Sequence, residues 1–349
     1  MPSDMMRAAV LYRAKDLRLE KRQRTAPGPG EVEVRVRAVG VCGSDVHYYE
    51  DGRIGENTIT TPLSPGHEMA GTVEKIGVGV NDLQPGQPVA VEPGRACGAC
   101  RYCLAGKYNL CLDMRFCGTP PTHGAYSEYF TTARPFVHPV PESMSMAEAA
   151  MIEPLAVAVH AVDYVHIRSL DSVAVLGCGS IGLLVMRCAK IAGAGRLWCV
   201  DRLAERLELA RSTYGADEAL NQDETDVVET ILGGTDGLGV EFAFEAAGSP
   251  QTFQQALDVT RPGGTAVLIG ICSEDQVPLE LHKARRKELT IQMARRFRFT
   301  YPRAIELAAS GRVDLASLVT HRFPLDEIEK AFALVNEYRD GVVKAVIEV

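Results

Sequence analysis

Four cysteines, Cys97, Cys100, Cys103 and Cys111, lie within one short stretch of the chain. Their short spacings allow four thiolates to meet at one tetrahedral centre, which is the ligand set of structural zinc sites. In the cysteine run of bacterial ferredoxins, the gap before the last cysteine is shorter and a proline follows that cysteine. Here Leu112 follows Cys111, which disfavours an iron–sulfur cluster. Disulfide frameworks belong to small secreted domains, and a chain of 349 residues does not need one. We therefore predict a zinc ion with four protein ligands and a structural role.

A second set of metal-binding side chains comprises Cys42, His67, Glu68 and Glu153. One thiolate combined with imidazole and carboxylate ligands suits zinc, and three protein ligands leave a fourth position for catalysis. Adjacent residues of a regular strand face opposite ways, so His67 and Glu68 can share a metal only where the backbone bends. Gly66 makes such a bend feasible.

Gly177, Gly179 and Gly182 form the pattern G-x-G-x-x-G between a predicted strand and a predicted helix. In that context the glycines permit the turn, the approach of a pyrophosphate and close helix packing, respectively. Asp201 ends the next predicted strand, where a carboxylate can hold the ribose hydroxyls and repel a 2′-phosphate. NAD is therefore favoured over NADP, although the adjacent Arg202 is a cation that a 2′-phosphate could use.

Two kinds of scaffold must position these motifs. Polar and apolar residues alternate over residues 31–38, which predicts a half-buried strand in a mostly β domain. After Met144 the pattern changes to repeated strand and helix units, which is typical of a parallel sheet covered by helices. Strands are predicted at residues 172–176, 196–200, 240–245, 265–269 and 289–293, with helices at about 181–192, 203–214 and 325–338.

The predicted fold class is α/β. Residues 155–295 are expected to form a doubly wound parallel-sheet domain for the coenzyme. Residues 1–154 and 296–349 are expected to form the metal-binding domain, because the C-terminal stretch is too short to close a core alone.

Composition narrows the classes of partner. Hydrophobic residues make up 46% and charged residues 23% of the chain, which is ordinary for a globular protein. A net charge of −8 gives no reason to bind nucleic acid, and the basic stretch 283–287 is interpreted as a solvated or subunit face. No apolar run is long enough to cross a bilayer and the start lacks a signal-peptide layout. We expect no membrane partner and a cytoplasmic location.

The sequence resembles the zinc-dependent medium-chain dehydrogenases, most closely the polyol dehydrogenases that act on sorbitol and xylitol. The resemblance spans almost the whole chain. The segments that carry it are residues 42–49, 52–55, 66–68, 118–121, 152–155, 177–182 and 320–325. The family's fold implies a GroES-like β domain for the metal and a Rossmann domain for NAD.

The resemblance also implies roles for individual residues. Cys42, His67 and Glu68 would hold a catalytic zinc, with Glu153 beside it as an exchangeable or water-mediated ligand, and which glutamate binds directly stays open. Neighbours of the substrate or of its proton path would be Ser44, His47, Tyr48, Arg296 and Phe297. The cofactor would contact Gly177, Gly179, Ile181, Gly182, Asp201, Arg206, Ile269, Gly270, Ile271, Ala294, Arg295 and Arg296.

Two features depart from the animal sorbitol enzymes. Those enzymes lack the cysteine cluster, so this chain is expected to carry two zinc ions per subunit, one catalytic and one structural. Where they have an Arg-Tyr pair near the substrate, this chain has Arg296 and Phe297, which removes a hydroxyl from the pocket.

The implied activity is the reversible, NAD-dependent oxidation of a polyol to a ketose, of the L-iditol 2-dehydrogenase or D-xylulose reductase type. The family also implies a homotetramer or a dimer. A rival within the superfamily is an L-threonine 3-dehydrogenase-like or other zinc alcohol dehydrogenase. A rival from another class is a non-catalytic protein that binds zinc and a dinucleotide.

Overall fold

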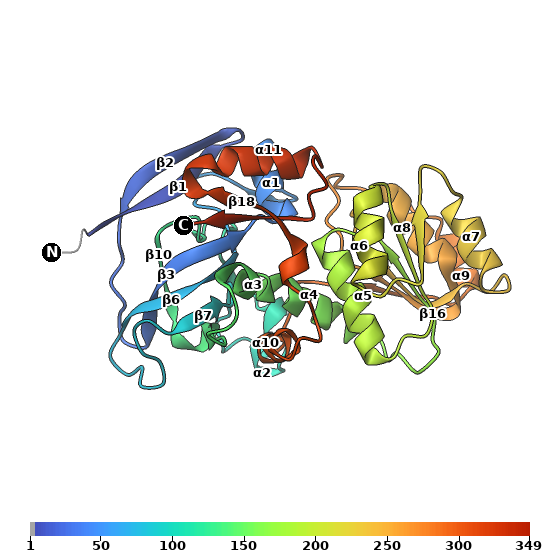
Figure 1. The fold of residues 1–349 in the computed structure, drawn as a ribbon, viewed down its shortest axis with the longest axis horizontal. Helices are drawn as coiled ribbons and strands as arrows, with labels where there is room; N and C mark the ends of the chain where they lie inside the picture. The colour runs from blue at the N-terminus through green and yellow to red at the C-terminus, as the bar shows by residue number, and fades with distance from the viewer. Residues whose placement is uncertain (1–3) are drawn as a thin grey trace. The chain divides into compact units, whose positions relative to one another are not determined.

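The computed structural model describes residues 4–349, which form two compact units (Figure 1). The β unit comprises the described residues up to Glu153 together with Tyr301–Gly311 and Leu315–Val349, and the parallel-sheet unit comprises Pro154–Thr300 and Arg312–Asp314. The chain therefore leaves the β unit at Pro154, returns to it at Tyr301, and adds only the short stretch Arg312–Asp314 to the parallel-sheet unit after that. The division into a metal-binding and a coenzyme domain stays a prediction about function.

The β unit is built on a seven-stranded sheet with the order β11-β7-β6-β3-β19-β18, in which β10 also pairs with β3. Its strands are β3 (Glu31–Gly40), β6 (Glu68–Ile76), β7 (Pro88–Val91), β10 (Tyr129–Ala133), β11 (Val137–Pro139), β18 (Val319–Pro324) and β19 (Lys344–Glu348). The alternation over residues 31–38 is confirmed, because Val32, Val34 and Val36 are buried there. Glu33 departs from it, since this buried carboxylate pairs with Arg24 at 2.9 Å.

Smaller elements complete the β unit. The two-stranded pairs are β1 (Met5–Arg13) with β2 (Asp16–Gln23), β4 (Arg53–Ile54) with β5 (Asn57–Thr58), and β8 (Gly94–Arg95) with β9 (Arg115–Phe116). The helices are α1 (Gly43–Asp51), α2 (Arg101–Leu104), α3 (Met146–Ala150), α10 (Tyr301–Ala309) and α11 (Ile328–Asn336), and α4 (Ile152–Val162) leads into the second unit.

The parallel-sheet unit has six parallel strands in the order β14-β13-β12-β15-β16-β17. Numbered within the unit this is 3-2-1-4-5-6, the order of a doubly wound dinucleotide-binding sheet, so the predicted fold class is confirmed. The strands are β12 (Val173–Leu176), β13 (Leu197–Asp201), β14 (Glu218–Asn221), β15 (Val240–Glu245), β16 (Thr260–Leu268) and β17 (Thr290–Met293). The helices are α5 (Ser180–Ala192), α6 (Ala204–Ser212), α7 (Val227–Gly233), α8 (Pro250–Val259) and α9 (Leu281–Arg286).

The basic stretch 283–287 is exposed at Lys283, Arg285 and Arg286, as expected of a solvated face, but one of its residues departs from the expectation. Lys287, expected in a solvated basic stretch, directs its ammonium onto the carbonyl oxygens of Asp258 at 2.6 Å and Thr260 at 2.9 Å. These carbonyls lie at the end of α8, where backbone acceptors have no partner within the helix. Lys287 therefore caps α8.

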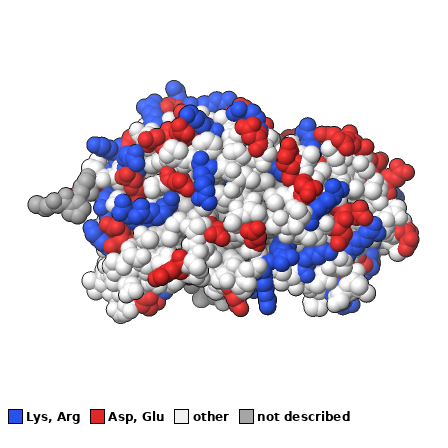
Figure 2. All heavy atoms as spheres, in the orientation of Figure 1, with Lys and Arg blue, Asp and Glu red and all other residues white. Residues whose placement is uncertain are grey.

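Charges of both signs are interspersed on the face of the molecule drawn in Figure 2. Among residues 4–349, no helix is both long and apolar enough to cross a membrane.

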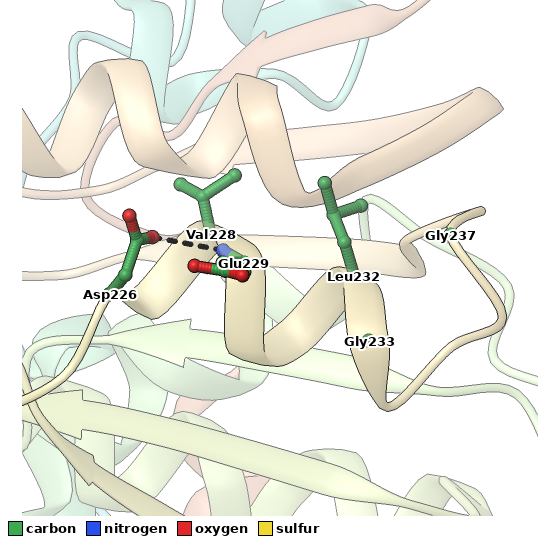
Figure 3. Close-up of a pocket in the computed structure, with 6 residues that line it drawn as sticks. All are labelled: Asp226, Val228, Glu229, Leu232, Gly233 and Gly237. Atoms are coloured by element: carbon green, nitrogen blue, oxygen red, sulfur yellow. Dashed lines mark hydrogen bonds between the residues drawn. The ribbon is translucent and has the colours of Figure 1, made fainter.

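A surface hollow on α7 is lined by Asp226, Val228, Glu229, Leu232, Gly233 and Gly237 (Figure 3). Its Asp226 carboxylate accepts a hydrogen bond from the Glu229 amide at 2.9 Å and so caps the helix. Since the other lining groups are apolar side chains, glycines and a second acid, the hollow offers no catalytic constellation.

Candidate metal centre and coenzyme loops

Three side chains of the β unit converge on one point. Cys42 directly precedes α1, His67 directly precedes β6, and Glu68 is the first residue of β6. The ligand atoms of these three residues all lie within 4.8 Å of one another. His67 is 7% exposed and Glu68 1%, so the cluster is largely removed from water. The structure thus brings together the three residues expected to hold a catalytic zinc.

Gly66 supplies the bend that this convergence requires. Its φ of 94° lies in the left-handed region, which L side chains rarely adopt. A Cβ atom at this position would also lie 2.9 Å from the Tyr126 ring. Regular pairing of β6 begins only at Glu68, so His67 escapes the strict alternation of the strand.

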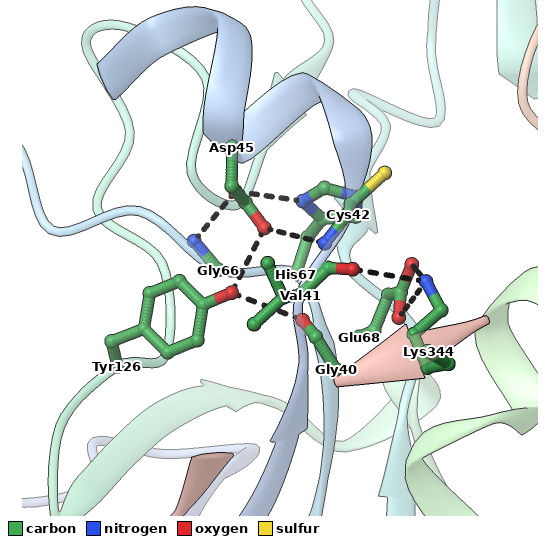
Figure 4. A network of polar contacts seen from close by, with 9 residues as sticks. All are labelled: Gly40, Val41, Cys42, Asp45, Gly66, His67, Glu68, Tyr126 and Lys344. Atoms are coloured by element: carbon green, nitrogen blue, oxygen red, sulfur yellow. Dashed lines mark hydrogen bonds and ion pairs between the residues drawn. The ribbon is translucent and has the colours of Figure 1, made fainter. Parts of the chain in front are cut away.

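Asp45 lies directly behind the cluster, as Figure 4 shows. Its carboxylate faces His67 Nδ1 at 3.5 Å and accepts hydrogen bonds from the backbone amides of Gly66 at 3.0 Å and Cys42 at 3.2 Å. The other ring nitrogen, Nε2, is then available to a metal. A carboxylate behind a ligating histidine fixes the tautomer and orientation of its ring.

Lys344 of β19 lies on the other side of the cluster (Figure 4). Its ammonium donates to the two carboxylate oxygens of Glu68 at 2.8 and 3.0 Å and to the Val41 carbonyl at 3.1 Å. Burial lowers the pKa of Lys344, but the Glu68 carboxylate raises it above the ordinary value. The Glu68 charge is therefore neutralised inside the protein.

Buried charges also govern the acid–base behaviour of the cluster. Burial lowers the pKa of His67, whereas the Asp45 carboxylate and the Cys42 sulfur raise it well above its usual value. Glu153, at the start of α4, is 5% exposed, and its burial raises its pKa to about 7, with the Glu68 charge adding to the effect. A carboxyl group with a pKa near neutrality can both accept and release a proton under working conditions.

The expected substrate neighbours Ser44, His47 and Tyr48 all lie on α1. Positions three and four apart share one face of a helix, so these side chains can act on one ligand. Tyr48 is buried, and His47 Nδ1 lies 3.8 Å from the Asp51 carboxylate. Phe116 lies against His67 with ring centroids 5.4 Å apart, a neighbour that the sequence did not suggest.

The four-cysteine cluster is brought together by the loop between β8 and β9. The Sγ atoms of Cys97, Cys100, Cys103 and Cys111 lie within 4.8 Å of one another. The Cys100 amide donates to Cys97 Sγ at 3.3 Å, and the Cys97 amide donates to Cys111 Sγ at 3.3 Å. Backbone amides lower the pKa of Cys100 to about 6, while burial raises the pKa of Cys103 to about 12. Four convergent thiols fit a tetrahedral zinc.

In the parallel-sheet unit, the glycine loop joins β12 to α5, which begins at Ser180. A Cβ atom on Gly182 would lie 1.7 Å from the Gly177 carbonyl oxygen, so the loop and helix pack too closely for any side chain there. A Cβ atom on Gly179 would meet only the Arg206 guanidinium, at 3.7 Å. Gly179 thus leaves open space beside a cation at a helix N-terminus, which is an arrangement suited to phosphate.

Asp201 connects this loop to the end of β13. One carboxylate oxygen accepts from the Cys178 amide at 2.7 Å, and the other accepts from the amides of Arg202 and Leu203 at 2.7 and 3.0 Å. The Arg202 side chain pairs with Asp223 at 3.1 Å. Arg202, the cation that a 2′-phosphate of NADP could use, is therefore already paired with Asp223.

The remaining coenzyme candidates follow the carboxyl ends of parallel strands at the same edge of the sheet. Residues 269–271 follow β16 and residues 294–296 follow β17, and the Ala294 amide donates to the Leu268 carbonyl at 2.8 Å. Ile181 is the second residue of α5 and is half-buried. Phe297 is buried after this segment, and Arg296 has a left-handed φ of 52°. Ligands of open α/β sheets bind at this edge.

Comparison with known proteins assigns the family. Residues 28–142 match the alcohol dehydrogenase GroES-like domain, and residues 180–310 match the zinc-binding dehydrogenase domain. The chain is 38% identical to sorbitol dehydrogenase of Bacillus subtilis (strain 168) over 346 residues. This aligned region covers 98% of this chain and 97% of the relative. The chain belongs to the zinc-binding alcohol dehydrogenases.

Two solved structures of dehydrogenases share the whole fold. A zinc-binding dehydrogenase from Sinorhizobium meliloti 1021 bound to NADP has a TM-score of 0.92 at 31% identity, over 99% of this chain and 100% of that one. An alcohol dehydrogenase from Escherichia coli CFT073 complexed with NADH has a TM-score of 0.91 at 29% identity, with the same coverage. The expected combination of a GroES-like domain with a Rossmann unit is confirmed.

Three residues around the metal cluster escaped the sequence analysis. Asp45 stands within the segment 42–49, and its spacing of three residues from Cys42 was the available signal. Tyr126 and Lys344 reach the cluster from distant positions, 81 residues from Asp45 and 276 from Glu68. Only the tertiary fold of this zinc-binding alcohol dehydrogenase places them there.

Proposed function

We propose that this chain is a zinc- and NAD-dependent polyol dehydrogenase that reversibly oxidises a sorbitol- or xylitol-type polyol to the ketose. The observation that carries the proposal is the buried cluster of Cys42, His67 and Glu68 in a chain 38% identical to a sorbitol dehydrogenase. When bound, zinc would polarise the substrate hydroxyl and the nicotinamide would accept a hydride.

The residues of this chain have separate tasks in that reaction. Cys42, His67 and Glu68 would hold the metal, while Asp45 keeps the His67 ring oriented. Glu153 would receive the substrate proton on its carboxylate, for which its pKa of about 7 is suited. Ser44 and Tyr48 would orient the remaining hydroxyls, which need polar partners when buried.

NAD is the proposed coenzyme. The Asp201 carboxylate suits two ribose hydroxyls, and its charge disfavours a 2′-phosphate. Pairing of Arg202 with Asp223 supports this choice, because that cation already has an acidic partner. Comparable kcat/KM values with NADP and NAD would contradict it.

The cysteine cluster is proposed to hold a second, structural zinc, with residues 1–154 and 296–349 as the catalytic domain and residues 155–295 as the coenzyme domain. A homodimer or tetramer is also proposed. β17 supports it, because this strand ends the parallel sheet and exposes Ile291 and Met293. Light scattering tests the oligomer, and cell fractionation tests the proposed cytoplasmic location.

A substrate panel with metal counting tests the activity. NAD-coupled oxidation of sorbitol, xylitol, arabinitol, galactitol and L-threonine is compared for the wild-type protein and Cys42→Ser. We expect turnover with a polyol that falls by at least about 100-fold in Cys42→Ser. Turnover with threonine alone indicates the L-threonine 3-dehydrogenase-like alternative. Two bound zinc ions without any turnover indicate the non-catalytic binding protein.

A further inference from the structure

The hydrogen bonds behind His67 extend one residue beyond Asp45, to Tyr126. The Tyr126 hydroxyl lies 3.0 Å from Asp45 Oδ2 and 3.0 Å from the carbonyl oxygen of Gly40 (Figure 4). Tyr126 follows β9 in the chain, Asp45 is on α1, and Gly40 ends β3. One hydroxyl of the segment after β9 therefore meets two groups of the short stretch that joins β3 to α1, more than 80 residues earlier in the chain.

Tyr126 is fully buried, and its ring is fixed from two sides. It lies against Gly66, where a Cβ atom would approach within 2.9 Å, and it contacts Phe332 of α11 with ring centroids 5.7 Å apart. The ring thus packs on the same glycine whose bend presents His67 to the metal cluster. Because the ring is fully buried between these neighbours, the hydroxyl has little freedom to leave Asp45.

The bonds to Asp45 show what the hydroxyl contributes. Oδ1 receives the Gly66 amide and faces His67, whereas Oδ2 receives the Cys42 amide and the Tyr126 hydroxyl. The two amides hold the carboxylate within the local backbone. Tyr126 is the side-chain donor that fixes its rotation from the opposite side, and a buried carboxylate oxygen that lost this donor would be underbonded.

We propose that Tyr126 is a positioning residue of the metal centre: its hydroxyl locks the Asp45 carboxylate, which in turn directs His67 toward the metal. The inference rests on the proposed function, since it assumes that His67 ligates zinc. Tyr126 itself touches neither metal nor substrate. Its loss should therefore weaken metal binding through Asp45 alone.

The test compares Tyr126→Phe, which removes only the hydroxyl, with Tyr214→Phe. Tyr214 is equally buried and donates to the Asp314 carbonyl at 2.6 Å in the parallel-sheet unit, so it controls for the general cost of removing a buried hydroxyl. Zinc affinity of the Cys42 centre is measured by chelator competition, and the centre is identified by its loss in Cys42→Ser. We expect zinc to bind about tenfold more weakly to Tyr126→Phe than to the wild type. The zinc affinity of Tyr214→Phe should be unchanged.

A double-mutant cycle separates positioning from general destabilisation. Asp45→Asn is expected to weaken zinc binding by at least as much as Tyr126→Phe, and adding Tyr126→Phe to Asp45→Asn should cost no further affinity. An equal loss in both backgrounds, or no loss in Tyr126→Phe, overturns the proposal. A wild-type protein whose Cys42 centre binds no zinc overturns the proposed function as well, which distinguishes the two failures.

A cobalt-substituted protein gives a second readout should Tyr126→Phe not fold. Replacement of Tyr126 by 3-fluorotyrosine keeps the ring and the hydroxyl but strengthens the donor. The visible absorption bands of cobalt at the Cys42 centre should then shift. Bands that match those of the unmodified cobalt protein overturn the proposal.

Discussion

At the scale of single residues, the metal centre is a balance of buried charges. Glu68 and Asp45 are carboxylates in a site that is almost closed to water. The Lys344 ammonium lies 2.8 Å from Glu68 and compensates one of the two negative charges. Buried ions are costly unless they are paired and hydrogen-bonded. Burial of the Glu68 carboxylate therefore depends on its pairing with the Lys344 ammonium.

Removing that ammonium should destabilise the protein strongly. Lys344→Met leaves the Glu68 carboxylate buried without a counter-ion, and breaking such a pair typically costs roughly 3–5 kcal/mol. Urea unfolding of the metal-stripped protein measures the loss. The double variant Lys344→Met with Glu68→Gln should recover part of it, because no net charge is then buried. A single variant as stable as the wild type would contradict this account of the pair.

The residues that sequence alone could assign were those close together in the chain. The spacing of Cys97, Cys100 and Cys103 and the motif at Gly177 are local patterns, and the structure assembles both. Lys344 could not be assigned in this way. An isolated lysine near an apolar stretch has no pattern of its own, and its role depends on β19 pairing beside β3.

At the scale of elements, the candidate coenzyme site depends on how closely the glycine loop packs against α5.

Strands β12, β13, β15 and β17 were predictable within a residue or two, because buried apolar runs between turns are local signals. β14 (Glu218–Asn221) was not predicted, since a four-residue edge strand with polar ends carries almost no periodicity.

Two alanine substitutions in the glycine loop should have different effects. Gly179→Ala has room for its methyl group in the protein and an ordinary φ of −69°, so folding should be unchanged. The methyl group would, however, hold back the pyrophosphate, and we expect NAD binding weaker by at least about tenfold, or about 1.4 kcal/mol. Calorimetric titration measures the affinity.

Gly182→Ala is the matched control, because its methyl group collides with the Gly177 carbonyl. It should lower the unfolding temperature as well as NAD affinity. If Gly179→Ala binds NAD like the wild type, the pyrophosphate does not approach the loop at that residue.

Strand β15 carries two acids that should respond to pH in opposite directions. Burial raises the pKa of Glu245 above its ordinary 4.5, despite hydrogen bonds from Thr252 and the Gly248 amide. Its contribution to stability is full below pH 4.5 and is lost as the pH rises through the raised pKa. Glu245→Gln should therefore gain stability over the wild type on going from pH 4 to pH 8, measured as the urea midpoint.

Glu241 provides the control at the start of the same strand. Burial raises its pKa, but hydrogen bonds from Ser172 lower it below the ordinary value overall. The contribution of the Glu241 carboxylate to stability is therefore present above pH 4.5 and is lost as the pH falls through the lowered pKa. Glu241→Gln should therefore lose stability relative to the wild type over the same rise in pH. The same trend in both variants would contradict the assignment.

At the scale of the whole molecule, the two units divide the chemistry between them. The β unit contains both clusters of candidate metal ligands, and the parallel-sheet unit contains the glycine loop and Asp201. A chain with a net charge of −8 and interspersed surface charges does not attract an anionic coenzyme over long distances. Phosphate recognition must therefore come from local groups such as Arg206 and the α5 N-terminus.

Metal removal should affect the molecule in two separable ways. Cys100→Ser should lose the metal of the four-cysteine loop and lower the unfolding temperature of the β unit, because structural zinc contributes folding energy. Cys42→Ser should lose the other metal and the activity with a smaller change in unfolding temperature. Elemental analysis and calorimetry of both variants check this. Identical thermal shifts would contradict a division into structural and catalytic centres.

The placement of β19 between β3 and β18 has a consequence for biosynthesis. Lys344 is translated 276 residues after Glu68, which takes roughly 14–55 s at about 5–20 residues per second. During that interval Cys42, His67 and Glu68 have all been synthesised, while the cation that neutralises Glu68 does not yet exist. The nascent chain must therefore keep its future metal ligands hydrated until the intervening Rossmann segment has been synthesised.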